Sequence, residues 1–432
     1  MAGEQTVRDY VTLVRGITYK GNLVGKPGPA LLGLGSIYPG GGFREGDYKT
    51  YGGECPPKLM LSPGDLFVSL KGATKDGKMI GSVARVPNSV KSGRLTQDTV
   101  KLEFRDSSKR KASSYLYWLL RTPQYRTYCD GRAMGSAVVA LSRDDFLDFP
   151  APSLSPSRKS IVEVLERIED KIELNRRMNA TLEAMARALF QSWFVDFGPV
   201  RAKLDGRQPP GLDPSTAALF PEHLEDSPLG HIPKGWTAQR LPDAIEVNPR
   251  RTLKSATIAP YLDMKNLPTQ GHSAEEVIYR EFSSGTKFQN GDTLLARITP
   301  CLENGKTGYV DFLEDGQVGW GSTEYIVLAP KPPLPPQFGY LLARSDALRT
   351  HAIQNMTGTS GRQRVPSECF NTFWLAVPPP DIARRFDELT APLMAKIKAN
   401  STESRTLATL RVTLLPKLLG GEIGVVGAAQ SL

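Results

Sequence analysis

IVEVLERIEDKIELNRRMNATLEAMARALFQSW, residues 161–193, is the stretch that decides how this 432-residue chain is organised. Side chains along it fall on one seam, at alternating steps of four and three residues, which is typical of a helix that packs lengthwise against another helix. At 1.5 Å per residue the predicted helix is about 50 Å long. The seam positions are Ile161, Leu165, Ile168, Ile172, Asn175, Asn179, Leu182, Ala186, Leu189 and Trp193.

A second, weaker seam lies 225 residues further on, so we predict a second long helix that packs on the first. Its positions are Phe386, Thr390, Leu393, Ile397, Asn400, Ser404, Leu407, Arg411, Leu414 and Leu418, with Leu389 and Leu410 beside them. Asn175 and Asn400 are equivalent in the two seams. A buried polar residue in a seam lowers stability and favours one register. The alternative, that both side chains face solvent, stays open.

The rest of the chain repeats as well. GDLFVSLKG at residues 64–72 is echoed by GDTLLARIT at residues 291–299. A proline-rich stop precedes each long helix, FPAPSLSP at 149–156 and AVPPPD at 376–381. The chain is therefore predicted to be two copies of one plan, namely a globular part, a proline-rich stop and a long helix.

Each globular part is predicted to be an α+β domain. Short apolar or β-branched runs between turn residues predict strands at 66–70, 83–86, 293–298 and 325–328. Helical spacing predicts helices at 113–120 and 337–348. The expected boundaries are a first domain at 1–150, the first long helix at 151–205, a linker at 206–235, a second domain at 236–376, the second long helix at 377–420 and a tail at 421–432.

Composition argues against a membrane protein. The chain is 40% hydrophobic and 23% charged, and no run approaches the roughly 18 to 20 apolar residues of a membrane span. Its start, MAGEQTVRDYVTLVRG, has no apolar stretch of the kind found in signal peptides, so we expect a cytoplasmic protein. Four cysteines, Cys55, Cys129, Cys301 and Cys369, are scattered singly among only four histidines, which predicts reduced thiols and no metal site.

The charge balance suggests an anionic partner that binds chiefly to the first half. The net charge is +9, and residues 1–150 carry 22 Lys and Arg against 14 Asp and Glu. Residues 231–376 are nearly balanced, with 15 against 14. Any binding driven by charge is therefore expected to depend most on the first half.

No motif for catalysis or nucleotide binding is complete. GKT at 305–307 matches the end of a phosphate-binding loop, but Pro300 stands where that loop needs a glycine N–H. NPRR at 248–251 lacks the aromatic residue with which a DNA methyltransferase stacks a flipped base. EDK at 169–171 has a nuclease-like spacing but lies inside the long helix, where charged residues on a solvated face are expected. We therefore expect no catalytic residue in this chain.

Two segments resemble the ends of the central helices of Type I restriction-modification specificity subunits. They are LFQSWFVDFGPVRAK at 189–203 and LLPKLLGGEI at 414–423, and the order of parts matches that family over nearly the whole chain. Gly420-Gly421 departs from the family's more common Ser-Gly pair. The resemblance implies an α+β fold of two similar target-recognition domains, separated by two long antiparallel coiled-coil helices in a pseudo-twofold repeat.

The aromatic residues Trp193, Phe194 and Phe197 of the first of these segments have two interpretations. As an aromatic helix end they would pack in the core. The resemblance adds that such helices form the surface on which methyltransferase subunits sit.

The resemblance also implies a function in phage defence. The chain would read a bipartite site in double-stranded DNA and direct adenine methylation and cleavage by two methyltransferase subunits and two restriction/translocase subunits. S-adenosylmethionine, ATP and Mg²⁺ would be bound by those partners and not by this chain. Two alternatives stay open: the recognition part of a fused catalytic restriction and methylation enzyme, and a coiled-coil scaffold that binds no DNA.

Candidate DNA contacts lie in loops of the repeated domains. TGTSGRQR at 357–364 offers two guanidinium groups and an amide, which suit guanine and adenine edges, and the resemblance places a DNA-facing loop there. KGATKDGK at 71–78 and the arginine of CDGRAMGS at 129–136 suit phosphate better than bases. Ordinary polar loops are the alternative. The predicted contacts are Lys71, Lys75, Lys78, Arg132, Arg297, Lys306, Ser360, Arg362, Gln363 and Arg364.

Overall fold

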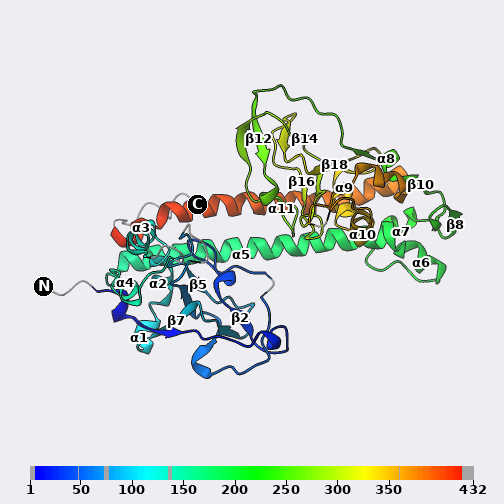
Figure 1. Ribbon diagram of the computed structural model, residues 1–432. Coiled ribbons are helices and arrows are strands. Elements are labelled where there is room, and N and C mark those ends of the chain that lie inside the picture. The colour runs from blue at the N-terminus through cyan, green and yellow to red at the C-terminus, as the bar shows by residue number, and fades with distance from the viewer. Residues whose placement is uncertain (1–4, 47, 73–76, 135–138, 360, 421–432) are drawn as a thin grey trace. The chain divides into compact units, whose positions relative to one another are not determined.

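The computed structural model describes residues 5–46, 48–72, 77–134, 139–359 and 361–420. The chain divides into two compact units, Met1–Ile172 with Thr406–Leu432, and Glu173–Arg405. Two long helices, α5 (Pro156–Phe190) and α11 (Pro380–Leu414), contribute residues to both units (Figure 1). Among the described helices, none is both long enough and apolar enough to cross a membrane.

In the first unit a four-stranded antiparallel sheet has the order β1-β7-β4-β5. Strand β4 is buried on both faces, since Leu66 and Val68 enter one core and Phe67 enters another, as alternating side chains of a strand do. A second sheet, of order β2-β6-β3, lines the core around Phe67. The strands are β1 (Val11–Arg15), β2 (Ala30–Leu32), β3 (Met60–Leu61), β4 (Leu66–Ser69), β5 (Val83–Arg85), β6 (Gly93–Leu95) and β7 (Thr99–Phe104).

Short helices close the other core of the first unit. Thr122 caps α3 by accepting a bond from the Tyr125 N–H, and Pro123 occupies its first turn, where a missing N–H costs nothing. Ile161 of α5 and Leu418 of α12 complete this core. The helices are α1 (Ser107–Arg110), α2 (Ser113–Leu119), α3 (Pro123–Arg132), α4 (Arg143–Leu147) and α12 (Lys417–Gly420), with 3₁₀ turns η1 (Val7–Asp9), η2 (Gly21–Leu23), η3 (Leu34–Ser36) and η4 (Pro57–Leu59).

The second unit has the same two-sheet plan. Its four-stranded sheet has the order β11-β18-β15-β16, and its other sheet has the order β13-β12-β17-β14. Strand β15 is again buried on both faces, with Leu295 in one core and Leu294 in the other. The strands are β11 (Ile245–Val247), β12 (Ile258–Leu262), β13 (Ile278–Glu281), β14 (Thr286–Phe288), β15 (Thr293–Ala296), β16 (Thr307–Tyr309), β17 (Gly319–Gly321) and β18 (Tyr325–Pro330).

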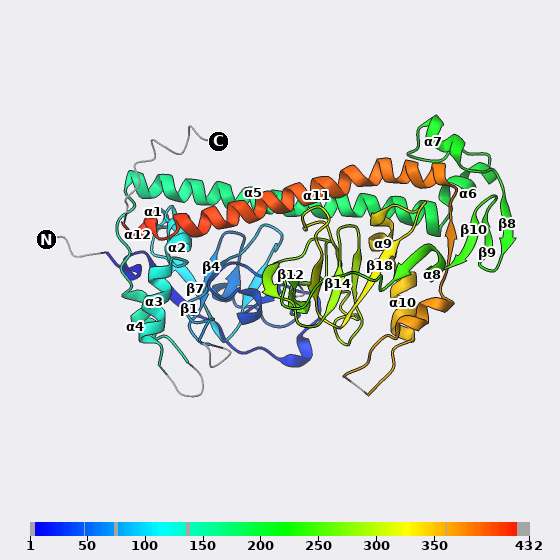
Figure 2. The ribbon, with the colours of Figure 1, turned by 90° about the horizontal axis from the view of Figure 1, so that it is seen from above.

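Helix α9 of the second unit packs on β18 and β15 (Figure 2). The segment 206–235, expected to be a linker, contains α7 and the β8–β9 hairpin. The remaining elements are the π-helix η5 (Gln191–Val195), α6 (Gly198–Leu204), α7 (Pro214–Leu219), β8 (Leu224–Ser227), β9 (Gly230–Pro233), β10 (Thr237–Arg240), α8 (Leu241–Ala244), η6 (Met264–Asn266), α9 (Pro336–Ala343), α10 (Asp346–Gln354), η7 (Ser367–Thr372) and β19 (Trp374–Val377), which pairs with β10.

The internal repeat predicted from the sequence is confirmed by the topology. The sheet of order β1-β7-β4-β5 in the first unit corresponds strand by strand to the sheet of order β11-β18-β15-β16 in the second. The other sheet of each unit contains one parallel pair of strands, β2 with β6 in the first unit and β12 with β17 in the second. A hydroxyl caps the helix that follows, Thr122 before α3 and Ser345 before α10. The edge strand β13 is an addition to the second unit, because the described part of the first unit has no strand at that place.

The long helices pack antiparallel within each unit, as predicted. In the second unit Asn175 contacts Asn400, whereas Phe190, further along α5, contacts Phe386, earlier on α11. In the first unit Glu169 binds Arg411 with a 2.6 Å ion pair. Every predicted seam position of both helices is buried or half-buried, which confirms the heptad spacing.

Carboxylates of α5 also fasten it to both units. In the first unit Trp118 Nε1 donates to Glu166 at 2.6 Å, and Arg85 binds the same carboxylate. In the second unit the buried Tyr340 hydroxyl donates to Glu183 at 2.7 Å, and burial raises the pKa of Tyr340 well above its usual range. The helix is therefore bonded, as well as packed, to each unit.

Candidate nucleic-acid interface

Each unit contains the same junction of three chain segments. In the first, Ala140 forms β-bridges to both Lys71 and Met134. In the second, Arg364 forms bridges to both Ile298 and Thr357. The segment after β4 thus corresponds to the segment after β15, and the loop after α3 to the loop after α10. We call these places the first and second junctions.

Several predicted contacts among the described residues lie at these junctions, Lys71 at the first and Arg297, Gln363 and Arg364 at the second. Lys71 is exposed at the first junction, where the Gly72 N–H donates to the Val139 carbonyl at 2.8 Å. Lys78 is exposed beyond the same loop, and its carbonyl accepts a 3.2 Å bond from Arg126. Lys75 lies outside the described residues. The first junction therefore presents ammonium groups on flexible stems, which suit phosphate.

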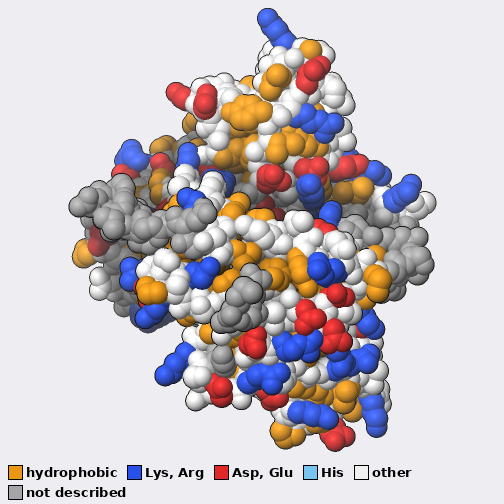
Figure 3. Space-filling view, turned by 90° about the vertical axis from the view of Figure 1, so that its left-hand side faces the viewer, with side chains coloured by type: hydrophobic (Ala, Val, Ile, Leu, Met, Phe, Trp, Pro, Cys, Tyr) orange, Lys and Arg blue, Asp and Glu red, His pale blue; other side chains and the backbone are white. Residues whose placement is uncertain are grey.

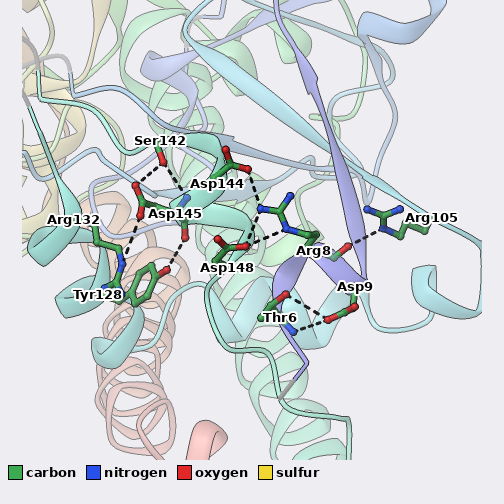
Figure 4. A network of polar contacts seen from close by, with 10 residues as sticks. All are labelled: Thr6, Arg8, Asp9, Arg105, Tyr128, Arg132, Ser142, Asp144, Asp145 and Asp148. Atoms are coloured by element: carbon green, nitrogen blue, oxygen red, sulfur yellow. Dashed lines mark hydrogen bonds and ion pairs between the residues drawn. The ribbon is translucent and has the colours of Figure 1, made fainter. Parts of the chain in front are cut away.

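Arg132 stands next to the first junction in a network of polar contacts (Figure 4). Its guanidinium lies 3.8 Å from the ring centre of Tyr128 and its Nε 3.7 Å from Asp145. The Tyr128 hydroxyl donates to the Asp145 carbonyl at 2.8 Å, and Ser142 caps α4 by accepting from the Asp145 N–H. Burial raises the pKa of Tyr128, so the ring remains a neutral platform for the cation.

The same network ties the chain's start to α4. Arg8 binds Asp144 at 2.9 Å and Asp148 at 2.8 Å, and its carbonyl accepts a 2.7 Å bond from Arg105 (Figure 4). These bonds raise the pKa of Arg8. The pairs are solvent-exposed, so they are worth little in stability; they orient α4 beside Arg132.

The loop at the second junction is a narrow hairpin. Thr357 and Arg364 exchange two backbone hydrogen bonds, of 2.9 and 2.8 Å. Gly358 and Gly361 have φ values of +116° and +79°, which side chains other than glycine's rarely adopt. Arg362 is exposed, while Gln363 is half-buried and its carbonyl accepts from the Thr299 N–H at 3.0 Å. Ser360 lies outside the described residues.

Arg364 forms the strongest ion pair of the second junction. Its Nε and Nη2 bind the carboxylate of Glu324, with a shortest distance of 2.7 Å, and this bonding raises the pKa of Arg364. The Arg297 N–H donates to the Glu324 carbonyl at 3.0 Å. The Nε atom of Arg297 is buried without a partner in the described part of the chain. Glu324 is therefore bonded to both arginines, to Arg364 through its carboxylate and to Arg297 through its backbone carbonyl.

Lys306, by contrast, is used inside the chain. Its ammonium donates to the carbonyls of Met264 at 2.6 Å and Lys265 at 3.0 Å, so it braces the turn between β15 and β16. Arg344, on the helix side of this turn, braces it further through the carbonyls of Thr269 and Thr307.

Sequence reasoning missed Glu324 altogether. It lies 40 positions before Arg364 and far from any loop that had been singled out. The available signal was the repeat: Glu324 precedes β18 and faces Arg297 across the sheet, so the strand register could have located it.

On the side of the molecule that Figure 3 shows, surface charge alone does not mark a binding face. On the side shown in Figure 3, basic and acidic side chains are interleaved and do not gather into one basic patch. Within the described residues, no group of three or more His, Cys, Asp or Glu side chains could hold a metal ion. Local geometry at the junctions is therefore more informative than net charge.

The aromatic helix end packs inside the second unit. Trp193 and Phe194 are 1% and 7% exposed, and their rings contact those of Phe220 and Phe386 at 4.8 and 4.7 Å. Phe197 is half-buried on Trp236. A hollow of about 560 Å³ lies beside this cluster. The residues lining it are Met185, Ala188, Leu189, Ser192, Trp193, Gly198, Pro199, Arg201, Ala202, Arg207, Pro209, Pro210, Gly211 and Leu212.

The seam asparagines are buried, so the solvent-facing alternative is wrong. Asn175 and Asn400 are 0% and 2% exposed. Asn175 Nδ2 donates to the Asn400 carbonyl at 3.3 Å and to Glu403 at 2.8 Å. Asn400 Nδ2 donates to Asn179 at 2.9 Å. We call Asn175, Asn179 and Asn400 the polar layer.

Comparison with known proteins agrees with the duplicated fold. No family model matches the chain. It is 25% identical over 328 residues to the Type I restriction enzyme MjaIX specificity subunit of Methanocaldococcus jannaschii, covering 72% of this chain and 69% of that protein. It is 23% identical over 313 residues to the Type I restriction enzyme HindI specificity subunit of Haemophilus influenzae, covering 62% and 67%.

A solved structure shares the fold. The crystal structure of the Type I restriction-modification S subunit from M. genitalium matches with a TM-score of 0.52 and 15% identity, over 96% of this chain and 95% of that one. The α+β fold class is therefore confirmed. The resemblance to Type I specificity subunits, drawn from the helix ends, is confirmed by the curated homologues.

Proposed function

We propose that this chain, a homologue of the Type I restriction specificity subunits, is the non-catalytic DNA-recognition subunit of a Type I restriction-modification complex. It reads a bipartite site in double-stranded DNA, each unit reading one half. The observation that carries this proposal is the repeated junction, because Lys71 and Arg364, candidate contacts of the two halves, each lie at a junction of the duplicated fold. Repeated binding surfaces are what a split site requires.

The junctions differ in the contacts assigned to them. At the second, Arg362, Gln363 and Arg364 read base edges, with Ser360 in the same loop, because guanidinium and amide groups pair with guanine and adenine. Arg297 lies on the neighbouring segment, where its carbonyl accepts a hydrogen bond from the Val365 N–H.

At the first junction, Lys71, Lys75 and Lys78 bind phosphate, with Arg132 as a fixed cation beside them. Lys306 adds positive charge near the second site while its ammonium holds the turn.

The chain works through partners. Two methyltransferase subunits bind S-adenosylmethionine and methylate adenine, and two restriction/translocase subunits use ATP and Mg²⁺ to cleave, all in the cytoplasm. Trp193, Phe194 and Phe197 hold the helix end on which a methyltransferase subunit sits. The polar layer sets the register of the two long helices.

Selection of DNA by the purified full chain, with its methyltransferase partner, tests this function. A random duplex library should yield one motif with two specified parts and an unspecified gap. Methylation should require the partner, since the chain alone should transfer no methyl group above blank. Selection of no sequence would favour the scaffold interpretation, and methyl transfer by the chain alone would favour the fused-enzyme interpretation.

A further inference from the structure

Glu324 holds the guanidinium of Arg364 by one edge. Arg364 Nε lies 2.9 and 3.0 Å from the two carboxylate oxygens, and Nη2 lies 2.7 Å from Oε1. Nη1 donates to the Arg362 carbonyl at 3.4 Å, which is longer than a normal N–H···O bond. Of the five N–H donors of a guanidinium, one on Nη1 and one on Nη2 remain without a partner in the described part of the chain. The edge formed by Nη1 and Nη2 is therefore open to a ligand with two adjacent acceptors.

The sheet places Glu324 for this contact. The Glu324 carbonyl accepts a hydrogen bond from the Arg297 N–H, and Ile298, the residue after Arg297, forms a β-bridge to Arg364. The chain segments around Glu324, Arg297 and Arg364 therefore lie side by side at the second junction. The side chain of Glu324 is 24% exposed and that of Arg364 is 44% exposed. The carboxylate is thus the more buried partner, and the arginine is the more accessible one.

We propose that Arg364, positioned by Glu324, reads a guanine in the half-site recognised by the second unit; this rests on the proposed function. Guanine presents two adjacent acceptors, O6 and N7, in the major groove, which match the two free N–H groups. A phosphate would lie close to the Glu324 carboxylate, and like charges repel at that range. A base edge carries no net charge, so the ion pair favours a base over the backbone.

Among the described residues of the first unit, the corresponding bridge position holds no arginine. Ala140 occupies the bridge position that Arg364 occupies in the second unit, and a methyl group cannot donate a hydrogen bond. We therefore expect this contact in the half-site of the second unit only, and the other half-site serves as an internal control.

The test uses the full chain and the duplex selected from the random library. Each guanine of the second half-site is replaced in turn by 7-deazaguanine, which lacks the N7 acceptor, and Kd is measured by fluorescence anisotropy. At one guanine the wild-type chain should lose affinity by roughly 10-fold, in the range expected for a lost bidentate base contact. Arg364→Ala should bind the natural duplex about as weakly and should be insensitive to 7-deazaguanine at that base.

Glu324 variants separate positioning from charge. Glu324→Gln should lose part of the discrimination at that guanine. Glu324→Ala should lose more, while its binding to random duplex strengthens, because a negative charge near DNA has been removed. A merely structural carboxylate would not shift discrimination at one base. Arg384→Ala, which breaks an exposed arginine-aspartate pair on α11, is the matched control and should change neither quantity; thermal melts check that all variants fold.

The outcomes are distinguishable. Three results would overturn this inference and leave the proposed function standing. The half-site read by the second unit could contain no guanine, or 7-deazaguanine could lower the affinity of the wild-type chain and of Arg364→Ala equally. Arg364→Ala could also lose the same affinity for every DNA sequence. Failure of the wild-type chain to select any sequence would overturn the proposed function, and this inference with it.

Discussion

The two junctions hold an arginine by different means. Arg132 stands beside the first junction, its guanidinium over the Tyr128 ring and 3.7 Å from Asp145, which is an ion pair without a normal hydrogen bond. Arg364 lies on the second junction and binds Glu324 at 2.7 Å through two of its nitrogens. The first arrangement holds the cation against a ring face without a normal hydrogen bond, and the second sets the plane of the guanidinium.

The two units therefore share the arrangement of their sheets but differ in the side-chain contacts that hold their arginines. A cation held without directional hydrogen bonds suits phosphates, because contacts to phosphate carry no sequence information directly. A fixed guanidinium suits a base, because discrimination needs aligned donors. If each unit reads its own half of the DNA, the two halves should respond separately to changes, and four experiments test how separate they are.

The largest effect is expected from lengthening both long helices. Inserting one heptad after Ile172 in α5 and one before Thr406 in α11 adds about 10 Å while keeping both seams in phase. We expect binding to the original site to fall toward the non-specific level, on the order of 1,000-fold or more weaker. Selection should then recover both half-sites with a gap longer by about three base pairs, since base pairs are spaced at about 3.4 Å. Recovery of the original gap would show that the helices do not set it.

Trp193→Ala tests whether the stability of the two units depends equally on the aromatic cluster around Trp193. Loss of a buried tryptophan costs about 3 to 5 kcal/mol, and Trp193 packs entirely within the second unit. Hydrogen exchange should show lower protection of β15 and β18 than of β4 and β7. Trp118→Ala in the core of the first unit is the matched control and should reverse the pattern. Equal loss of protection in both units after either change would mean that they unfold together.

Much of the fold could be predicted because it depends on local periodicity. Every position of the predicted heptad seam on α5 and α11 is buried or half-buried, since burial between two packed helices follows the spacing of the seam. The repeat of GDLFV and GDTLL located β4 and β15, which occupy the same place in their sheets. The π-helix at Gln191–Val195 was not predicted, because a local register change leaves no periodic signal.

The candidate site could be predicted only in part. Glycines at 358 and 361 and the two arginines that follow them identified a loop from its local composition. The role of Lys306 was not visible, because its two carbonyl partners lie some 40 residues earlier. Glu324 was missed for the same reason, since its contact with Arg364 exists only after the strands pair.

Arg362→Ala and Gln363→Ala test, at the level of single bases, whether the two half-sites respond separately. Each lost bidentate base contact costs about 1 to 3 kcal/mol of discrimination, and both residues lie at the second junction. Methylation profiling of the variant complexes should show one half of the motif relaxed or lost and the other half unchanged. Alteration of both halves by Arg362→Ala would contradict the assignment of one unit to one half-site.

Lys71→Ala should have the smallest effect, and one of a different kind. Lys71 is exposed at the first junction, where a flexible ammonium group suits a phosphate. Each phosphate contact contributes about 0.9 to the slope of log K against log salt, because binding releases condensed counterions. We therefore expect a few-fold weaker binding to all sequences, a slope lower by about one, and an unchanged motif. Lys91→Ala, which removes another exposed lysine of the same unit, is the control and should leave the slope as it was. A changed first half-site with an unchanged slope would mean that Lys71 reads a base, and that the two junctions are more alike than their arginines suggest.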